Sequence, residues 1–256
     1  MPRLPPVIKA TLPSRFSIAD SFSVLIDTIF LQWLATARQP IIVSNGTEKS
    51  LTMDKRGRPR TFDRDAALQR AMELFWENGF EETSMTDLTD AMGIASPSLY
   101  AAFGSKEALF REAVERYQGN VGTEIWDALD SEHEIAAAIG AFLMNTARSY
   151  SDETTPRGCM IVLGARSMGQ SSHPVCEMLK AHREMNLVRL RQRFDRAVAD
   201  GQLPATFDCA AAAAFYAALQ HGMSIIARDG ADAATLEAIA ITGRQSFALP
   251  AGAGVR

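Results

Sequence analysis

The stretch TSMTDLTDAMGIASPSLYAAF, residues 83–103, contains two short helical patterns separated by a three-residue turn. Ser84 is a favourable N-cap for the first helix, which is predicted to end at Gly93. Ser96 is predicted to cap a second helix, Pro97 to Phe103, that begins with proline. Two short helices joined by a tight turn that contains glycine are typical of a helix-turn-helix motif.

Further helices are predicted on both sides of this motif. Asp63 can cap a helix whose apolar residues recur at helical spacing until Gly79. Ser105 can cap a helix that begins at Lys106 and that we expect to run on toward Trp126. The motif and the helices around it are therefore predicted to form a small helical domain.

The rest of the chain also shows helical patterns and no strand pattern of any length. These patterns run over about 133–150, 157–168, 174–200, 208–228 and 231–247. We therefore predict an all-α fold of about nine helices, with an N-terminal three-helix helix-turn-helix DNA-binding domain and a C-terminal helical domain. The expected domain boundaries are 53–105 for the first and 106–256 for the second.

Residues 1–52 have a different character, with four of the eleven prolines and no helical period before residue 22, where an apolar run begins; a fifth proline, Pro40, follows that run. We expect either a disordered extension or a start codon assigned too far upstream, with Met53 as the true start. A signal peptide or anchor is the alternative for the apolar run at residues 22–37. Asp20 and Asp27 argue against it, because acidic groups are unfavourable in such a segment.

The charge distribution limits the kind of nucleic-acid contact. The formal net charge is −4, from 26 Lys and Arg against 30 Asp and Glu, which excludes a globally basic surface. One dense basic run consists of Lys55, Arg56, Arg58 and Arg60. We interpret this run as an arm that follows DNA, with a solvated tail as the alternative.

The cysteines and histidines indicate neither a metal site nor a catalytic one. Cys159, Cys176 and Cys209 are an odd number, widely spaced and without a C-x-x-C motif. The histidines lack ligand spacing, and no G-x-S-x-G motif is present. We therefore predict no catalytic residue, no metal and no cofactor, and a protein of the reducing cytoplasm.

The region from about residue 55 to residue 117 resembles the tetracycline-repressor (TetR/AcrR) family of transcription regulators. The resemblance is carried by Gly57-Arg58-Pro59-Arg60, Ala67, Leu74-Phe75, Gly79-Phe80, Thr83-Ser84-Met85, Leu88, Ala91-Met92-Gly93-Ile94, Leu99-Tyr100, Phe103, Lys106 and Leu109. It implies a bacterial repressor that binds a two-fold operator in double-stranded DNA as a homodimer, is released by a small-molecule effector, and is associated with the nucleoid when bound. A regulator without a ligand, acting as an activator or controlled by a protein partner, is the alternative, and an all-helical enzyme is a remote one.

The resemblance also implies the residues that contact DNA. The positions that match phosphate contacts are Thr86, Tyr100 and Lys106, and those that match base contacts are Ser96, Pro97 and Ser98. Ala95 and Ala101 stand where larger base-reading side chains often occur in the family. We therefore expect few direct base contacts and a larger share of phosphate and shape recognition.

The family resemblance also implies that the C-terminal helical domain serves ligand binding and dimerisation, so an effector pocket and a dimer surface are expected there. The candidate pocket residues are the larger apolar and sulfur-containing side chains Trp126, Phe142, Met144, Cys159, Met160, Met168, Met178, Phe215, Tyr216 and Met223. The last two long helices carry small residues and can form a four-helix bundle with a partner chain. The helix that begins at Lys106 is the expected lever between pocket and DNA.

Overall fold

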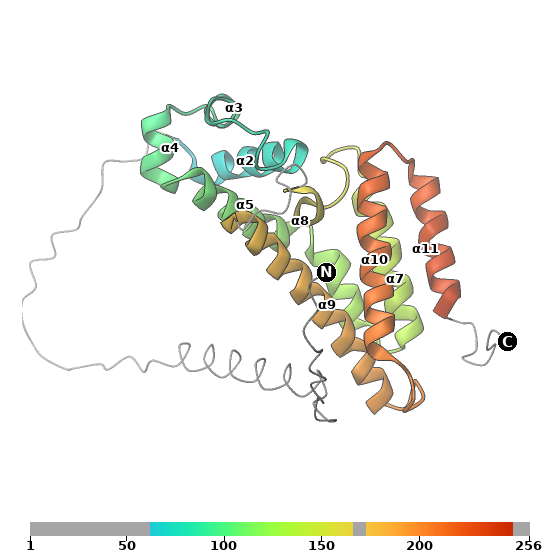
Figure 1. The fold of residues 1–256 in the computed structure, drawn as a ribbon. Coiled ribbons are helices and arrows are strands. Elements are labelled where there is room, and N and C mark those ends of the chain that lie inside the picture. The colour runs from blue at the N-terminus through green and yellow to red at the C-terminus, as the bar shows by residue number, and fades with distance from the viewer. Residues whose placement is uncertain (1–61, 166–172, 248–256) are drawn as a thin grey trace, which may run out of the picture. The chain divides into compact units, whose positions relative to one another are not determined.

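The computed structural model describes residues 62–165 and 173–247, all within one compact unit, Gly57–Arg256. Every regular element in these two ranges is an α-helix (Figure 1). The predictions for residues 1–52, for the basic run Lys55 to Arg60 and for Met168 lie outside the described residues. The helices are α2 (Arg64–Asn78), α3 (Met85–Met92), α4 (Ser96–Phe103), α5 (Lys106–Asn120), α6 (Thr123–Ser131), α7 (Ile135–Ser151), α8 (Met160–Leu163), α9 (Pro174–Ala199), α10 (Cys209–Arg228) and α11 (Ala233–Phe247).

Three of the predicted helix starts are confirmed by side-chain capping. Asp63 accepts hydrogen bonds from the backbone N–H groups of the first turn of α2, at 2.9 and 3.2 Å. Ser84 and Asp87 form a reciprocal capping box at the start of α3, with distances of 3.1 and 2.8 Å. Ser105 accepts from Ala108 N at 3.1 Å. These contacts satisfy N–H groups that have no helical partner, so local sequence alone determines where these helices begin.

The predicted cap of α4 was wrong by one residue. Ala95 is the N-cap, in an extended conformation and without a side-chain hydrogen bond, and Ser96 is the first helical residue. The carbonyl of Ala95 accepts the first helical hydrogen bond, from Leu99 N at 3.1 Å. Pro97 fits the second helical position as well as the first, because the first four N–H groups of a helix lack partners in any case.

Two helices are shorter than expected, and the described residues contain ten helices rather than nine. The helix from Lys106 ends at Asn120, and a separate helix, α6, carries Trp126. At the break Thr123 Oγ1 donates to Gly119 O at 2.8 Å, which satisfies a terminal carbonyl of α5. In the described part of the pattern at 157–168, up to residue 165, the helix is the single turn of α8, because Gly158 precedes it with φ of 79° and Gly164 ends it.

The helix-turn-helix and the following helices share one apolar core. The α2 and α5 helices pack against each other through aromatic rings, with centroids 4.9 Å apart for Phe75 and Phe110 and 4.8 Å for Trp76 and Tyr117. Leu88 of α3 and Leu99 of α4 are fully buried on this core. Further along the chain, α7 packs against α6, α10 and α11, and α9 packs against α10 (Figure 1).

Candidate DNA interface and inner cavity

The α4 helix buries one face and exposes the other. Leu99 and Phe103 are 0% and 4% exposed and hold the helix on the core. The opposite face carries Ser96, Pro97 and Tyr100, all exposed, with Ser98 half-buried beside them. Because the core side is determined by Leu99 and Phe103, the predicted base-contacting positions lie on the accessible face of this helix.

The turn before α4 is held rigid by local hydrogen bonds. Gly93 ends α3 in the left-handed region, with φ of 67°, which glycine adopts without strain. Ile94 N donates to Thr89 O at 3.1 Å, and Arg70 of α2 donates to Met92 O at 3.3 Å. The relative orientation of α3 and α4 is therefore stabilised from within the motif and from α2.

Thr86 and Lys106 differ in their surroundings. Thr86 is exposed in the first turn of α3. Lys106 is half-buried at the start of α5, and its ammonium lies 4.4 Å from the ring centroid of Phe80. Burial lowers the pKa of Lys106, while the nearby carboxylates of Glu81, Glu107 and Asp87 oppose that change. The cation–π contact explains how a lysine is tolerated at a helix N-terminus, where positive charge is unfavourable.

A cavity of about 200 Å³ lies among α5, α6, α7, α9, α10 and the residues around α8; we call it the inner cavity. Its walls include Tyr117, Trp126, Tyr150, Cys159, Arg189 and Gln220. Two of the candidate pocket residues, Trp126 and Cys159, therefore meet there. Phe142 lies behind the wall, with its ring centroid 5.2 Å from that of Trp126.

The other candidate pocket residues are not brought to this cavity. Met160 and Met223 are buried in the core, and Met178 packs against it. Met144 lines a separate depression between α7 and α11, and Phe215 is half exposed on α10. Tyr216 is buried, and its hydroxyl donates to Gly243 O at 3.2 Å.

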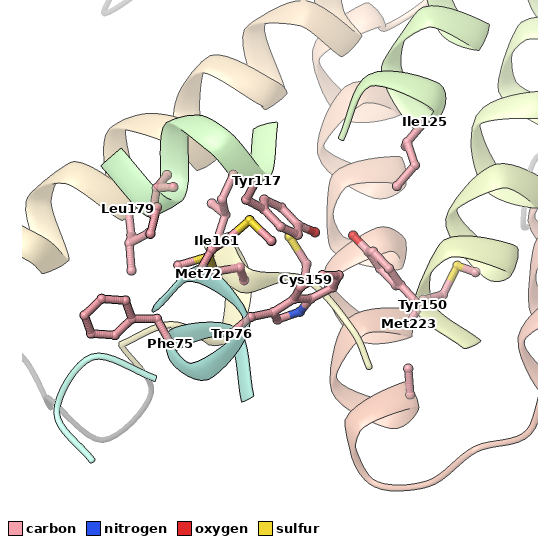
Figure 2. Close-up of a cluster of buried hydrophobic side chains, with 14 of the residues drawn as sticks. Met72, Phe75, Trp76, Tyr117, Ile125, Tyr150, Cys159, Ile161, Leu179 and Met223 are labelled. Atoms are coloured by element: carbon pink, nitrogen blue, oxygen red, sulfur yellow. The ribbon is translucent and has the colours of Figure 1, made fainter. Parts of the chain in front are cut away.

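Sequence reasoning missed the two tyrosines and the glutamine of the inner cavity. Tyr117 and Tyr150 stand in predicted helical segments, and the sequence pattern assigns neither of them to a pocket. They come from α5 and α7 and face Cys159 (Figure 2). The available signal was the polar tip of a tyrosine on an apolar face, since such a hydroxyl needs a partner when it is buried.

The segment 157–164 connects the inner cavity to the helix-turn-helix. Its residue Cys159 is a cavity wall, and the carbonyl of the preceding Gly158 accepts a hydrogen bond from Trp76 Nε1 of α2 at 3.0 Å. At the other end, Phe80 N donates to Gly164 O at 2.8 Å. The same eight residues thus contact the cavity and the C-terminal end of α2.

Arg228, the last residue of α10, adds a second connection. Its guanidinium donates to Trp76 O at 2.6 Å, to Glu77 O, and to Arg157 O at 3.0 Å. These carbonyls belong to the last turn of α2 and to the residue that precedes Gly158. A cation at a helix C-terminus is favourable both for hydrogen bonding and for the helix dipole.

Residues 62–165 and 173–247 contain no group of three or more His, Cys, Asp or Glu that could hold a metal ion. What they do contain is a helix-turn-helix with an accessible second helix, joined through the segment 157–164 and Arg228 to a helical domain that holds a cavity. This arrangement defines a helix-turn-helix transcription regulator.

Comparisons with known proteins identify the family. Residues 67–113 match the family model described as bacterial regulatory proteins, tetR family, and residues 136–241 match the tetracyclin repressor-like C-terminal domain. The chain is 36% identical over 188 residues to the HTH-type transcriptional repressor ComR of Escherichia coli (strain K12), covering 73% of this chain and 90% of ComR. It is 38% identical over 111 residues to the repressor BdcR of the same strain, covering 43% of this chain and 56% of BdcR.

A solved structure with similar sequence agrees. It is a cysteine mutant of the TetR family regulator CifR, complexed with 26 bp double-strand operator DNA, at 41% identity and a TM-score of 0.71. The match covers 74% of this chain and 100% of that one. The chain belongs to the TetR family, and it is a DNA-binding transcription regulator rather than an enzyme.

Proposed function

We propose that this protein is a cytoplasmic repressor that binds a two-fold operator as a homodimer and releases it when a small molecule enters the inner cavity. The observation that carries the proposal is the segment 157–164, which lines the cavity through Cys159 and hydrogen-bonds α2 through Gly158. The names of the relatives ComR and BdcR support the repressor role. The operator DNA bound to CifR supports the kind of target.

On the DNA side, phosphate contacts supply most of the affinity. Thr86, Tyr100 and Lys106 contact phosphates, together with the basic run Lys55, Arg56, Arg58 and Arg60. The side chains at the base-contacting positions Ser96, Pro97 and Ser98 are small. Since phosphate contacts carry no sequence information, specificity then depends on a few base contacts and on DNA shape.

The dimer surface is the outer face of α10 and α11. Phe215 and Ile225 of α10 are 50% and 40% exposed there. A depression of about 430 Å³ lies on this face between the two helices. The α10 helix is long and apolar enough by composition to cross a membrane, and one side of it joins the core of this unit through Tyr216, Met223 and Ala227. An exposed apolar face of this kind marks a protein interface, and a second copy of the chain covers it.

Release is transmitted through the segment 157–164 and Arg228. The expected lever, one helix running from Lys106 to Trp126, was wrong because α5 ends at Asn120. An occupant of the cavity that displaces Cys159 also displaces the carbonyl that Trp76 uses. The coupling is about 1–3 kcal/mol for proteins of this kind and is reciprocal, so operator DNA weakens effector binding by the same factor.

We expect Lys106→Ala to weaken binding to all DNA sequences about equally. Removing one phosphate contact from each subunit of a dimer lowers the slope of log K against log salt by about 2. The measurement is fluorescence anisotropy with a selected genomic operator fragment and with unrelated DNA, over a range of salt concentrations. Lys180→Ala is the matched control, since Lys180 lies on α9 and pairs with Glu184 at 3.9 Å. A change in base preference at one position, with an unchanged slope, contradicts the phosphate assignment.

We expect the double substitution Phe215→Asp and Ile225→Asp to give a folded monomer. Both side chains are exposed, so the charges disturb the partner surface rather than the core of the subunit. Sedimentation velocity measures the oligomeric state, and circular dichroism verifies the helix content. Leu187→Asp on α9, at a residue 37% exposed, is the control and leaves the dimer intact. If the double variant stays dimeric, the dimer surface lies elsewhere.

A further inference from the structure

Cys159, Tyr117 and Tyr150 meet at the buried end of the inner cavity. Their exposed fractions are 8%, 3% and 1%. All three side chains line the cavity, and Figure 2 shows the two phenol groups pointing toward each other beside this cysteine. The cavity therefore ends in a thiol that is flanked by two phenols from different helices.

The two phenols are hydrogen-bond donors, and the thiol that lies beside both of them is a weak acceptor. Sulfur accepts hydrogen bonds poorly, whereas buried tyrosine hydroxyls ordinarily find an oxygen or nitrogen acceptor. Burial raises the pKa of Tyr117 and Tyr150 well above the usual value, so both hydroxyls stay protonated. An oxygen placed beside the thiol satisfies both donors.

The surroundings of this cluster select a small neutral molecule. Ile125 and Ile161 form apolar walls, and Gln220 contributes a buried amide. The charged residues of the cavity wall are not available to a ligand at its buried end. Asp127 is exposed to solvent, and Arg189 is paired with Asp130 at the surface. A cavity of about 200 Å³ is also smaller than the sites that take drug-sized ligands.

We propose that the effector is a small aldehyde, to which Cys159 adds reversibly while Tyr117 and Tyr150 donate hydrogen bonds to its oxygen. This inference rests on the proposed function and names the chemical class of its effector. In the addition step the sulfur forms a bond to the carbonyl carbon, and the C=O π pair moves to the oxygen. The oxygen gains a proton and the thiol loses one, so the product is a neutral hemithioacetal and no other reactant is needed.

The position of the phenols favours an aldehyde over other electrophiles. When a thiol adds directly to a carbonyl, the oxygen stays on the attacked carbon, so donors that lie beside the sulfur also reach that oxygen. When a thiol opens an epoxide, the sulfur attacks the carbon from the side opposite the epoxide oxygen, so this oxygen points away from the sulfur. Conjugate addition to an unsaturated ketone places the oxygen several bonds from the sulfur. Neither geometry uses two donors that both lie beside the thiol.

The adduct is also connected directly to α2, which packs against the helix-turn-helix. Cys159 is covalently attached to Gly158, whose carbonyl accepts from Trp76 Nε1 at 3.0 Å. The backbone N–H of Cys159 donates to Ser224 Oγ at 2.8 Å, so the residue is tied to α10 as well. A group added to this thiol therefore strains contacts to α2 and α10 together.

The test uses the full chain and butanal labelled with carbon-13 at its carbonyl carbon. Nuclear magnetic resonance is expected to show a protein-bound signal of an sp3 carbon bonded to oxygen and sulfur, and fluorescence anisotropy to show release of operator DNA. Butan-1-ol and 1,2-epoxybutane are the comparison probes, because they match the carbon chain without an aldehyde group. If butan-1-ol or 1,2-epoxybutane releases the operator DNA at equal concentration and butanal does not, the assignment of the effector as an aldehyde is overturned.

Three variants separate the roles of the side chains. Cys159→Ser is expected to lose the adduct signal, and Tyr150→Phe to keep it with a dissociation constant about tenfold higher, as for loss of one hydrogen bond. Cys209→Ser is the control and keeps wild-type values. A signal that persists in Cys159→Ser, or none in the wild type, refutes the inference. DNA binding without butanal is measured in parallel, so that loss of binding there counts against the proposed function and not against the aldehyde site.

Discussion

Gly158→Ala is expected to destabilise the protein by roughly 3–5 kcal/mol, through backbone strain and overpacking together. Gly158 has φ of 79°, a conformation that side chains other than glycine rarely adopt. A Cβ atom would stand 2.6 Å from Ser224 O and 2.9 Å from Leu163 Cδ1. Because Ser224 O belongs to the backbone of α10, the clash cannot be relieved by turning a side chain.

The matched control is Gly201→Ala. Gly201 has a similar φ of 73°, but an added Cβ atom would meet no atom within 4 Å. We expect it to cost only about 1 kcal/mol, from the backbone conformation alone. Urea unfolding followed by circular dichroism measures both free energies. Equal losses in the two variants would show that the close approach of 157–164 to α10 contributes nothing.

Arg228→Met is expected to lower the free energy of unfolding by about 2–3 kcal/mol, since a guanidinium that donates to three carbonyls is removed. The methionine keeps much of the apolar stem, so the loss reports mainly the hydrogen bonds. We also expect faster amide exchange in the last turn of α2, where the carbonyls of Trp76 and Glu77 lose their partner. Urea unfolding and hydrogen exchange with mass spectrometry measure the two effects.

Arg191→Met is the control for this substitution. Arg191 lies on α9, its side chain is 61% exposed, and it pairs with Asp195 at 3.7 Å. Exposed ion pairs of this kind contribute at most about 1 kcal/mol. If Arg228→Met is as mild as the control and leaves exchange in α2 unchanged, then Arg228 does not connect α10 to the helix-turn-helix.

The helix-turn-helix was predictable because its signals are local. The Ser84 cap and the left-handed Gly93 act within one turn of the chain, and both are confirmed. Ser96 shows the limit of such signals. Serine before proline is a good cap by composition, yet the extended conformation of Ala95 starts the helix one residue earlier. Boundaries of this kind depend on how the turn packs, which a pattern of residue types does not contain.

The break after α5 and the short α8 were not predicted. Gly119 and Gly122 stand at the break, but isolated glycines are compatible with a continuous helix. Thr123 satisfies the freed carbonyls of α5, which makes the break favourable. Around α8 the decisive contact is between Gly158 and α10, residues far apart in the sequence. The prediction of one lever helix from Lys106 to Trp126 was wrong because of the break after α5.

The sequence by itself determined the all-helical class, the helix-turn-helix and the face of α4 that Leu99 and Phe103 bury, because helical periodicity and caps are properties of neighbouring residues. Only the tertiary structure decided which residues form the inner cavity. Tyr117, Tyr150 and Cys159 come from three separate segments, and each alone resembles an ordinary core residue. Their convergence follows from how α5, α7 and α8 pack, and packing depends on contacts between distant parts of the chain.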